Sequence, residues 1–344
     1  MIRLAVIGAG AVAEQGYLPA IEALPDATIG TVIDADDARA RAMAAQFDAD
    51  RHATTHIDHL DTIDGAIIAT PPAFHAEIAR ACLDAGIHVL TEKPVATDVK
   101  TARSLVDRAA EAGLHYAISR QQREAPAVRA MRSVLETGGL GNIESFRARF
   151  GDQTNWAFAS DYRMRSSLSW GGALTDKGPH ILDVLMWLLS DLDLQVTRYQ
   201  DDNLGGLEAN LVLTLADDTR DVAGTVEITA SRAVPNELTI VGSKGTITAD
   251  PGAAAASISD YITGERTRIT TDGDAHLTDY LARIAAQTNR FVEAIASDAS
   301  AYVPARTDIQ LIDLIETCYA TRTVAVEPWE ARHLDIATQE RIDG

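Results

Sequence analysis

RLAVIGAGAVA, residues 3–13, is the stretch that decides the fold. Its first five residues form a short apolar run typical of a buried strand, and Gly8-Ala9-Gly10-Ala11-Val12-Ala13 matches the Gly-x-Gly-x-x-Ala fingerprint of a dinucleotide-binding loop. Gly8 permits the tight turn, Gly10 lets a pyrophosphate approach the backbone, and the helix that starts near Ala11, Val12 and Ala13 offers unpaired N–H groups. We therefore expect a dinucleotide here, with a ligand-free glycine turn as the alternative.

The next hundred residues repeat this alternation of strand and helix. Further apolar runs are at 28–34, 65–69, 88–91 and 115–119, with helical stretches at 36–47, 75–85 and 98–112. This alternation predicts βαβ units on a parallel sheet. Residues 1–120 are therefore expected to form a doubly wound α/β domain of the Rossmann type.

Beyond residue 120 the pattern changes to that of an α+β domain, assigned to residues 121–344. Strands are expected at 144–150, 209–215, 225–230, 237–241 and 245–249, and helices at 126–137, 172–189, 276–296 and 307–323. These strands predict a largely antiparallel sheet with one open face. We expect that face to expose an apolar patch that a second subunit covers, giving a homodimer or homotetramer.

Composition excludes several classes of function. No apolar run approaches the 18 to 20 residues of a membrane span, and no secretory signal precedes residue 3, so a soluble, cytoplasmic protein is expected. The net charge of −20 argues against nucleic acid as a partner and favours a halophilic cytoplasm, with a GC-rich genome as the alternative explanation. Cys82 and Cys318 lack metal-ligand spacing, so both are interpreted as buried apolar groups. No metal is expected.

Acidic residues at the end of the second strand bear on the choice of cofactor. Asp34 stands where a carboxylate accepts hydrogen bonds from the adenosine ribose and repels a 2′-phosphate. Asp36 and Asp37 add to that repulsion, and Arg39 and Arg41 are the nearby candidates for a phosphate clamp. NAD is therefore favoured over NADP.

Two further strand ends deliver residues to the same edge of the sheet. Thr70, Pro71 and Pro72 follow one strand and are expected to line the dinucleotide groove, together with His75, for which a capping or packing role is the alternative. The next strand leads into Glu92 and Lys93, which we assign to the nicotinamide end of the groove. A surface ion pair is the ordinary interpretation of such a Glu-Lys pair.

Asp176 and His180 stand four residues apart in a predicted helix and would share one of its faces. With these residues in place, the chain resembles, over nearly its whole length, the oxidoreductase family of glucose-fructose oxidoreductase, inositol dehydrogenase and rhizopine catabolism proteins. The resemblance rests on the glycine loop, Glu92-Lys93-Pro94, residues 237–248, and a later motif matched by Gly171, Gly172, Asp176, Gly178, His180 and Asp183.

The resemblance implies that Lys93, Asp176 and His180 form the catalytic group of an NAD-dependent dehydrogenase acting on a sugar, sugar derivative or cyclitol. In that chemistry an imidazole takes the hydroxyl proton while hydride leaves for the nicotinamide. Lys93 would stabilise the developing alkoxide, and Asp176 would orient substrate hydroxyls. Asp183 is expected to support the site rather than to react.

Substrate contacts are expected from Lys93, Asp176 and His180, and from side chains outside that trio. The family's Asn-x-Arg-Phe segment is matched in part by residues 119–124, where Arg123 keeps the arginine and Glu124 replaces the aromatic residue. The loop before the catalytic helix adds Trp156, Tyr162, Arg163, Arg165 and Trp170, whose alternative roles are packing or surface. An NAD-dependent glycosidase and a non-catalytic NAD sensor stay open as other functions.

Overall fold

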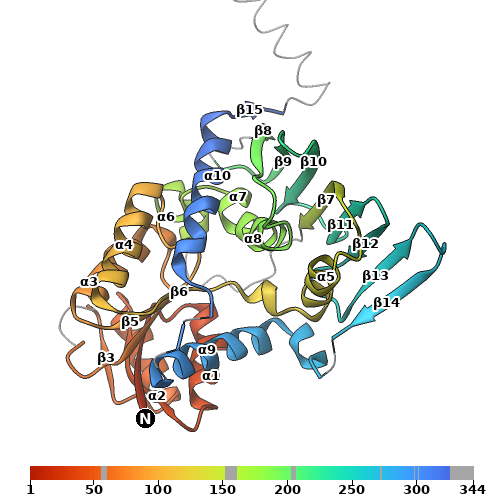
Figure 1. The fold of residues 1–344 in the computed structure, drawn as a ribbon. Coiled ribbons are helices and arrows are strands. Elements are labelled where there is room, and N and C mark those ends of the chain that lie inside the picture. Colours follow the sequence, from red (N-terminus) through yellow and green to blue (C-terminus); the bar gives the residue numbers. More distant parts are fainter. Residues whose placement is uncertain are drawn as a thin grey trace, which may run out of the picture.

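Two sheets organise the molecule (Figure 1). The computed structural model describes residues 1–55, 60–151, 161–202, 207–271, 273–297, 299–300 and 302–325. The first sheet has the strand order β3-β2-β1-β4-β5-β6, and every neighbouring pair in it is parallel. Its elements are β1 (Ile2–Ile7), η1 (Ala13–Tyr17), α1 (Leu18–Glu22), β2 (Ala27–Ile33), α2 (Asp37–Gln46), β3 (Arg51–Ala53), β4 (Gly65–Ile68), α3 (Pro72–Asp84), β5 (His88–Thr91), α4 (Val99–Ala112) and β6 (Tyr116–Ile118).

Helices cover both faces of this sheet, which explains its nearly continuous apolar strands. On one face, α3 and α4 enclose a core that includes Cys82 and Leu105. On the other face, α1 packs beside α9 (Tyr280–Ser297), whose Phe291 lies in the same core as Leu4. The predicted Rossmann arrangement is confirmed, and α9 is a C-terminal segment that returns to this N-terminal sheet.

The second sheet is mixed, with the order β14-β13-β12-β11-β7-β10-β9-β8-β15. Only the β7–β10 and β8–β15 pairs are parallel among the described strands, so the sheet is largely antiparallel, as predicted. Its strands are β7 (Ile143–Gly151), β8 (Gln195–Asp201), β9 (Asn210–Asp217), β10 (Val222–Thr229), β11 (Glu237–Gly242), β12 (Gly245–Ala249), β13 (Ala255–Asp260), β14 (Arg266–Thr270) and β15 (Thr323–Val324).

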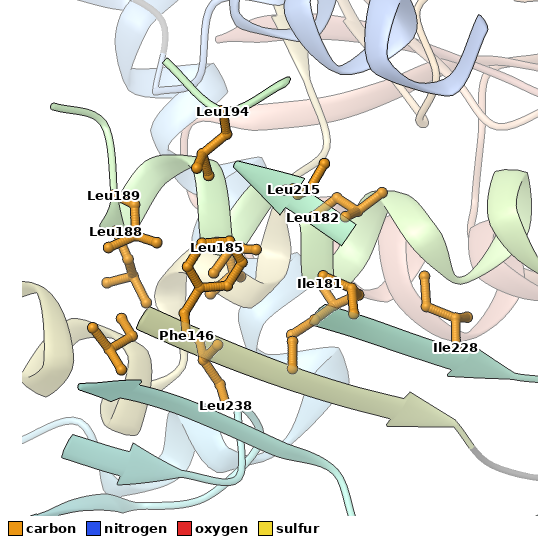
Figure 2. Close-up of a cluster of buried hydrophobic side chains, with 14 of the residues drawn as sticks. Phe146, Ile181, Leu182, Leu185, Leu188, Leu189, Leu194, Leu215, Ile228 and Leu238 are labelled. Atoms are coloured by element: carbon orange, nitrogen blue, oxygen red, sulfur yellow. The ribbon is translucent and has the colours of Figure 1, made fainter. Parts of the chain in front are cut away.

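The remaining helices join the two sheets or cover one face of the second. They are η2 (Gln121–Glu124), α5 (Pro126–Glu136), η3 (Tyr162–Met164), α6 (Ser166–Ser169), α7 (Ala173–Asp176), α8 (Gly178–Leu188), η5 (Ala275–Thr278), η6 (Ala305–Thr307) and α10 (Asp308–Ala320). Figure 2 shows the core between α8 and the sheet, where Leu185 and Ile181 of the helix face Phe146 and Leu238. This core fixes α8 against the sheet.

The open face of the second sheet differs from the expectation. Its outward positions on β9 and β10 include Val212, Thr214, Ala223 and Thr225, and small or polar side chains continue on β12. Val212 is the one large apolar residue of this sheet's central strands that is substantially exposed in the described chain. The predicted apolar patch is therefore wrong, because threonine, serine and charged residues occupy the outward half of the strand alternation.

One short strand was not predicted, and two predicted helix boundaries are wrong. Residues 51–53 form the short edge strand β3, which has too few residues to produce an apolar pattern. Helix α3 begins at Pro72 rather than His75, since proline is favoured in the first turn of a helix. The predicted helix at 172–189 is divided at Lys177 into α7 and α8.

Candidate active site

The glycine loop has the geometry that a dinucleotide site requires. Gly8 has φ of 97°, and a Cβ on it would stand 2.6 Å from the carbonyl oxygen of Ala69. A Cβ on Gly10, in contrast, would meet no atom within 4 Å. Ala13 is buried in the core, while Ala11 and Val12 are partly exposed at the start of the helix. The space above Gly10 is thus free for a phosphate group to approach the backbone.

Asp34 lies directly beside this loop. Its Oδ2 accepts a hydrogen bond from the N–H of Ala9 at 2.9 Å, and its Oδ1 accepts one from the N–H of Asp36, also at 2.9 Å. Arg39 Nη1 lies 3.5 Å from Asp34 Oδ2, whereas Arg41 pairs with Asp37. The carboxylate of Asp34 therefore faces the glycine loop with one guanidinium nearby.

The Thr70 loop and the Lys93 loop are joined by a buried histidine. Thr70, Pro71 and Pro72 are partly exposed at the carboxyl edge of β4, and Thr70 Oγ1 has no hydrogen-bond partner within the described chain. His75 is fully buried, with Nδ1 2.7 Å from the carbonyl oxygen of Pro94 and Nε2 2.7 Å from that of Thr70. Both ring nitrogens thus contact the protein backbone, and the ring connects the two loops.

Glu92 is held by buried polar side chains at the end of β5. Its Oε1 accepts hydrogen bonds from Tyr17 Oη at 2.6 Å, Ser119 Oγ at 3.0 Å and Gln121 Nε2 at 3.2 Å. Only 9% of the residue is exposed. Burial and the neighbouring Glu92 charge raise the pKa of Tyr17 well above its ordinary value, so the phenol keeps its proton and remains a donor. The carboxylate is a fixed negative charge beside Lys93.

Lys93, Asp176 and Arg163 form the polar centre of the site. Lys93 Nζ donates to the carbonyl oxygen of Asp176 at 2.6 Å and lies 3.6 Å from Asp176 Oδ1, while Arg163 Nη1 lies 3.3 Å from Asp176 Oδ2. Burial lowers the pKa of Lys93, against the opposing charges of Asp176 and Glu92. Burial acts to raise the pKa of Asp176, but Lys93 and Arg163 outweigh it and lower that pKa. The carboxylate is therefore ionised between two cations.

His180 completes this group from the first turn of α8. Its ring lies 6.4 Å, centroid to centroid, from the ring of Phe150, and no hydrogen bond to either ring nitrogen is formed by the described residues. Burial and the positive charge of Lys93 lower the pKa of His180 well below 6.5, despite the opposing charge of Asp176. The imidazole is therefore neutral at neutral pH and able to accept a proton.

Comparison with known proteins agrees with this geometry. Residues 2–119 match the model of an oxidoreductase family with an NAD-binding Rossmann fold, and residues 128–248 match the GFO/IDH/MocA C-terminal domain. Together these matches span more than half of the chain. The chain belongs to the GFO/IDH/MocA oxidoreductase family. The resemblance seen in the sequence is thereby confirmed, and the Rossmann domain is an NAD(P)-binding fold.

Two curated members of the GFO/IDH/MocA family and one solved structure illustrate the relationship. A dTDP-3,4-didehydro-2,6-dideoxy-alpha-D-glucose 3-reductase from Streptomyces violaceoruber is 29% identical over 72% of each chain. Inositol 2-dehydrogenase from Rhizobium meliloti is 24% identical over 98% of this chain and 99% of that protein. The structure of levoglucosan dehydrogenase with NADH and levoglucosan superposes with a TM-score of 0.80, at 20% identity over 93% of this chain and 98% of that one.

The two glycines of the family motif have a specific packing reason in this chain. A Cβ on Gly172 would lie 2.1 Å from the carbonyl oxygen of Glu208, and one on Gly171 would overlap the hydroxyl of Tyr319. The buried Glu208 Oε1 accepts hydrogen bonds from the N–H groups of Gly172 and Leu174 at 3.0 and 2.9 Å. Glu208 thus holds the turn that presents Asp176, a role that no motif in the sequence indicated.

The other predicted substrate residues divide between the site and its surroundings. Arg163 is at the site, where its Nε also donates to Tyr162 Oη at 3.2 Å. Arg165 is directed to the exposed Asp161, and Trp170 packs between the two cores. Trp156 lies outside the described residues.

Arg123 is turned toward α8 and pairs with the carboxylate of Asp183. Its Nε and Nη2 donate to Asp183 at 2.8 and 2.6 Å, and its guanidinium stacks over Trp187 with 5.5 Å to the ring centroid. Two further charged residues, Arg120 and Asp308, lie buried next to this pair and were not predicted from the sequence.

No helix in the described ranges is long and apolar enough to span a bilayer. Within the same ranges, no three histidine, cysteine or acidic side chains converge on a point that could hold a metal ion.

Proposed function

We propose that the chain is an NAD-dependent dehydrogenase that acts on a secondary hydroxyl of a sugar, sugar derivative or cyclitol. The observation that carries the proposal is the convergence of Lys93, Asp176 and a neutral His180 at the edge of the sheet that also presents the glycine loop. The named substrates of relatives, an inositol and a dideoxy-diketo sugar nucleotide, are six-membered rings that carry hydroxyl or ketone groups. They support the same substrate class here.

The residues present fit a dinucleotide. The backbone at Gly8 and Gly10 and the N-terminus of the following helix would hold the pyrophosphate, and Asp34 would accept the ribose hydroxyls. When bound, the nicotinamide accepts a hydride from the carbon that carries the hydroxyl, or returns one to it. A Cβ at position 10 would fill the open space over the loop, so the glycine there suits a ligand of this shape.

The chain's own side chains supply the proton chemistry. His180 in its neutral form accepts the hydroxyl proton at a ring nitrogen, and its low pKa keeps that form populated at neutral pH. The ammonium of Lys93 donates a hydrogen bond to the oxygen on which negative charge develops. Asp176, ionised and held by Arg163, accepts hydrogen bonds from neighbouring hydroxyls of the ring and fixes its orientation.

NAD is the cofactor that we favour. Asp34 lies 2.9 Å from the backbone of the glycine loop and would meet a 2′-phosphate as a like charge. Arg39, at 3.5 Å from Asp34, is the nearby cation that would work in favour of NADP. Because the carboxylate already accepts two backbone hydrogen bonds and is therefore held in place, we expect it to dominate.

The test is an assay of free aldoses, cyclitols and sugar nucleotides in molar KCl, with NAD or NADP, at the absorbance of the reduced nicotinamide. A dehydrogenase gives one NADH for each sugar oxidised, and the His180→Asn variant serves as the control. Turnover of a chromogenic glycoside with no net NADH would instead identify a glycosidase that oxidises its substrate transiently. Tight NADH binding without turnover of any compound would identify a sensor.

We further propose that the protein is cytoplasmic, halophilic and a homodimer or homotetramer through the second sheet. Its open face carries threonines such as Thr225 and the Arg149–Glu227 ion pair rather than an apolar patch, so hydrogen bonds and ion pairs would join the subunits. Light scattering tests the oligomeric state, and melting curves in 2 M and 0.1 M KCl test the halophilic adaptation. A monomer at all protein concentrations, or a melting temperature that salt does not change, would contradict the respective proposal.

A further inference from the structure

A cluster of four charged side chains, three of them buried and one partly buried, lies behind the catalytic residues. Arg120, Asp183 and Asp308 are 3%, 4% and 1% exposed. Arg120 Nε lies 3.2 Å from Asp183 Oδ1, and its Nη2 pairs with Asp308 Oδ1. Arg123 is the fourth member, in a two-point hydrogen bond with Asp183. With two positive and two negative charges, the cluster is electrically balanced, which is the condition under which buried charges are tolerated.

The cluster connects the two segments that carry the catalytic groups. Asp308 Oδ2 accepts a hydrogen bond from the N–H of Val95 at 2.9 Å, and Val95 stands two residues after Lys93. At the other end, Asp183 lies on α8 one turn after His180. A continuous path of polar contacts therefore runs from the Lys93 loop through Asp308 and Arg120 to the helix of His180.

Arg120 is not needed to neutralise Asp183, because Arg123 already does so. The two oxygens of Asp183 are already paired with Nε and Nη2 of Arg123. Arg120 instead adds the bridge from Asp183 to Asp308, and its own backbone N–H donates to Gln287 Oε1 of α9 at 3.0 Å. Burial lowers its pKa to about 10, so the guanidinium is charged at neutral pH.

We propose that Arg120 and Asp308 are positioning residues that hold the helix of His180 in register with the loop of Lys93. The proposal rests on the proposed function, in which both side chains act on one substrate oxygen. Neither Arg120 nor Asp308 needs to touch the substrate. Their effect on rate comes from geometry, because a displacement of about 1 Å in a reacting group lowers turnover by roughly a hundredfold.

Arg120 also contributes to the electrostatics of His180. The charged groups that shift the pKa of His180 most are Lys93 from the end of β5, Asp176 and Lys177 around α7, and Arg120 from the segment before η2. Lys93, Lys177 and Arg120 lower the pKa of His180, and Asp176 raises it. Removing the Arg120 cation should therefore raise that pKa and move the acid limb of the oxidation rate to higher pH.

The variant that tests this is Arg120→Met combined with Asp308→Asn. It removes one positive and one negative charge together, so no uncompensated charge is buried, and an asparagine oxygen can still accept the Val95 N–H. We expect kcat to fall about tenfold to a hundredfold, with the Kd for NADH changed less than threefold. The matched control is Arg129→Met, which removes an arginine of α5 that pairs with Asp274. This variant should keep kcat within twofold.

Two measurements do not depend on turnover. In crystals of the double variant, the Lys93 Nζ to Asp176 carbonyl contact of 2.6 Å should lengthen beyond hydrogen-bond distance. In NMR titrations of labelled histidine, assigned with His180→Asn, the His180 resonance should titrate at higher pH than in the wild type, because Arg120 and not Asp308 is among the groups that shift its pKa most. If the wild type oxidises no sugar, the proposed function fails, and these two measurements still decide the positioning role.

A purely structural role for the cluster would give a different set of results. A double variant with a lower melting temperature, but with the wild-type Lys93 contact, His180 titration and kcat, would show that the cluster only stabilises the fold. If the double variant does not fold, Arg120→Lys takes its place, since one ammonium keeps the charge but cannot bridge both carboxylates. Unchanged kcat and an unchanged Lys93 contact in Arg120→Lys would overturn the proposal.

Discussion

The two sides of the site are built by different means. The cofactor side is made largely of backbone, with Gly8 in a left-handed conformation against Ala69 and an open space above Gly10. The catalytic side is made of buried charges, among them Lys93 between the carbonyl and carboxylate of Asp176. A backbone site tolerates changes of side chain and fails when a Cβ is added. A charged site responds to the loss of a single group while its backbone remains intact.

The largest effect is expected on the catalytic side. Lys93→Met keeps the length of the side chain but removes the ammonium, and should lower kcat by about two orders of magnitude or more, comparable to the loss of one oxyanion donor. His180→Asn should cost a similar factor and remove the acid limb from the pH profile of kcat/KM. Stopped-flow and steady-state assays with the best substrate of the panel measure both.

NADH affinity provides the check on this first prediction. Because the proposed function places Lys93 and His180 at the substrate oxygen, NADH fluorescence titrations should give a Kd within about threefold of the wild type for both variants. A Kd that rises in parallel with the loss of kcat would mean that Lys93 mainly holds the cofactor.

A glycine pair probes the cofactor side. Gly8→Ala places a Cβ 2.6 Å from the Ala69 carbonyl oxygen in a left-handed residue, which should cost about 1–3 kcal/mol and lower the melting temperature by about 2 °C or more. Gly10→Ala should melt near the wild-type temperature, because its Cβ meets no protein atom. It should nevertheless weaken NADH binding about tenfold, or about 1.4 kcal/mol. Equal NADH affinity in Gly10→Ala and wild type would mean that no phosphate approaches this residue.

The same contrast explains what the sequence could predict. A required backbone conformation restricts a position to particular residue types, such as glycine. The loop from Gly8 to Ala13 and the apolar strands therefore predicted the parallel sheet and the edge at which the cofactor is expected. Buried strands such as β4 are apolar on both faces, and the antiparallel strands alternate, so both sheets were predictable. The apolar patch was predicted wrongly, because the outward half of the alternation in these strands carries threonine, serine and charged residues.

Long-range pairings were beyond the sequence pattern. Arg120 and Asp308 are 188 positions apart, and each looks like an ordinary surface charge until the fold brings them together. The same holds for Glu208, which holds the turn before Asp176 from a distant loop. Arg123 was expected to contact the substrate, but no pattern indicated that Asp183 would accept hydrogen bonds from its Nε and Nη2.

A smaller effect is expected from Asp34→Ala. The substitution removes the proposed acceptor for the ribose hydroxyls and releases Arg39, which lies 3.5 Å away, to meet a 2′-phosphate. The preference for NAD over NADP should narrow about tenfold, or about 1.4 kcal/mol, as measured by kcat/KM for each cofactor. A wild type that already prefers NADP by tenfold would show that Arg39 rather than Asp34 determines the choice.

The smallest effect separates two arginines that the sequence could not distinguish. Arg163 holds the Asp176 carboxylate at 3.3 Å, whereas Arg165 pairs with the exposed Asp161. Partly exposed ion pairs contribute about 0.2–1 kcal/mol, so Arg163→Met should lower kcat/KM by up to about fivefold, and Arg165→Met by less than that. Because Arg163 orients Asp176, its effect should fall on the binding of hydroxylated substrates and leave the Kd for NADH unchanged. If Arg165→Met instead shows the larger loss, that arginine turns toward the substrate in the complex, and the catalytic side extends further along this loop than its contacts with Asp161 indicate.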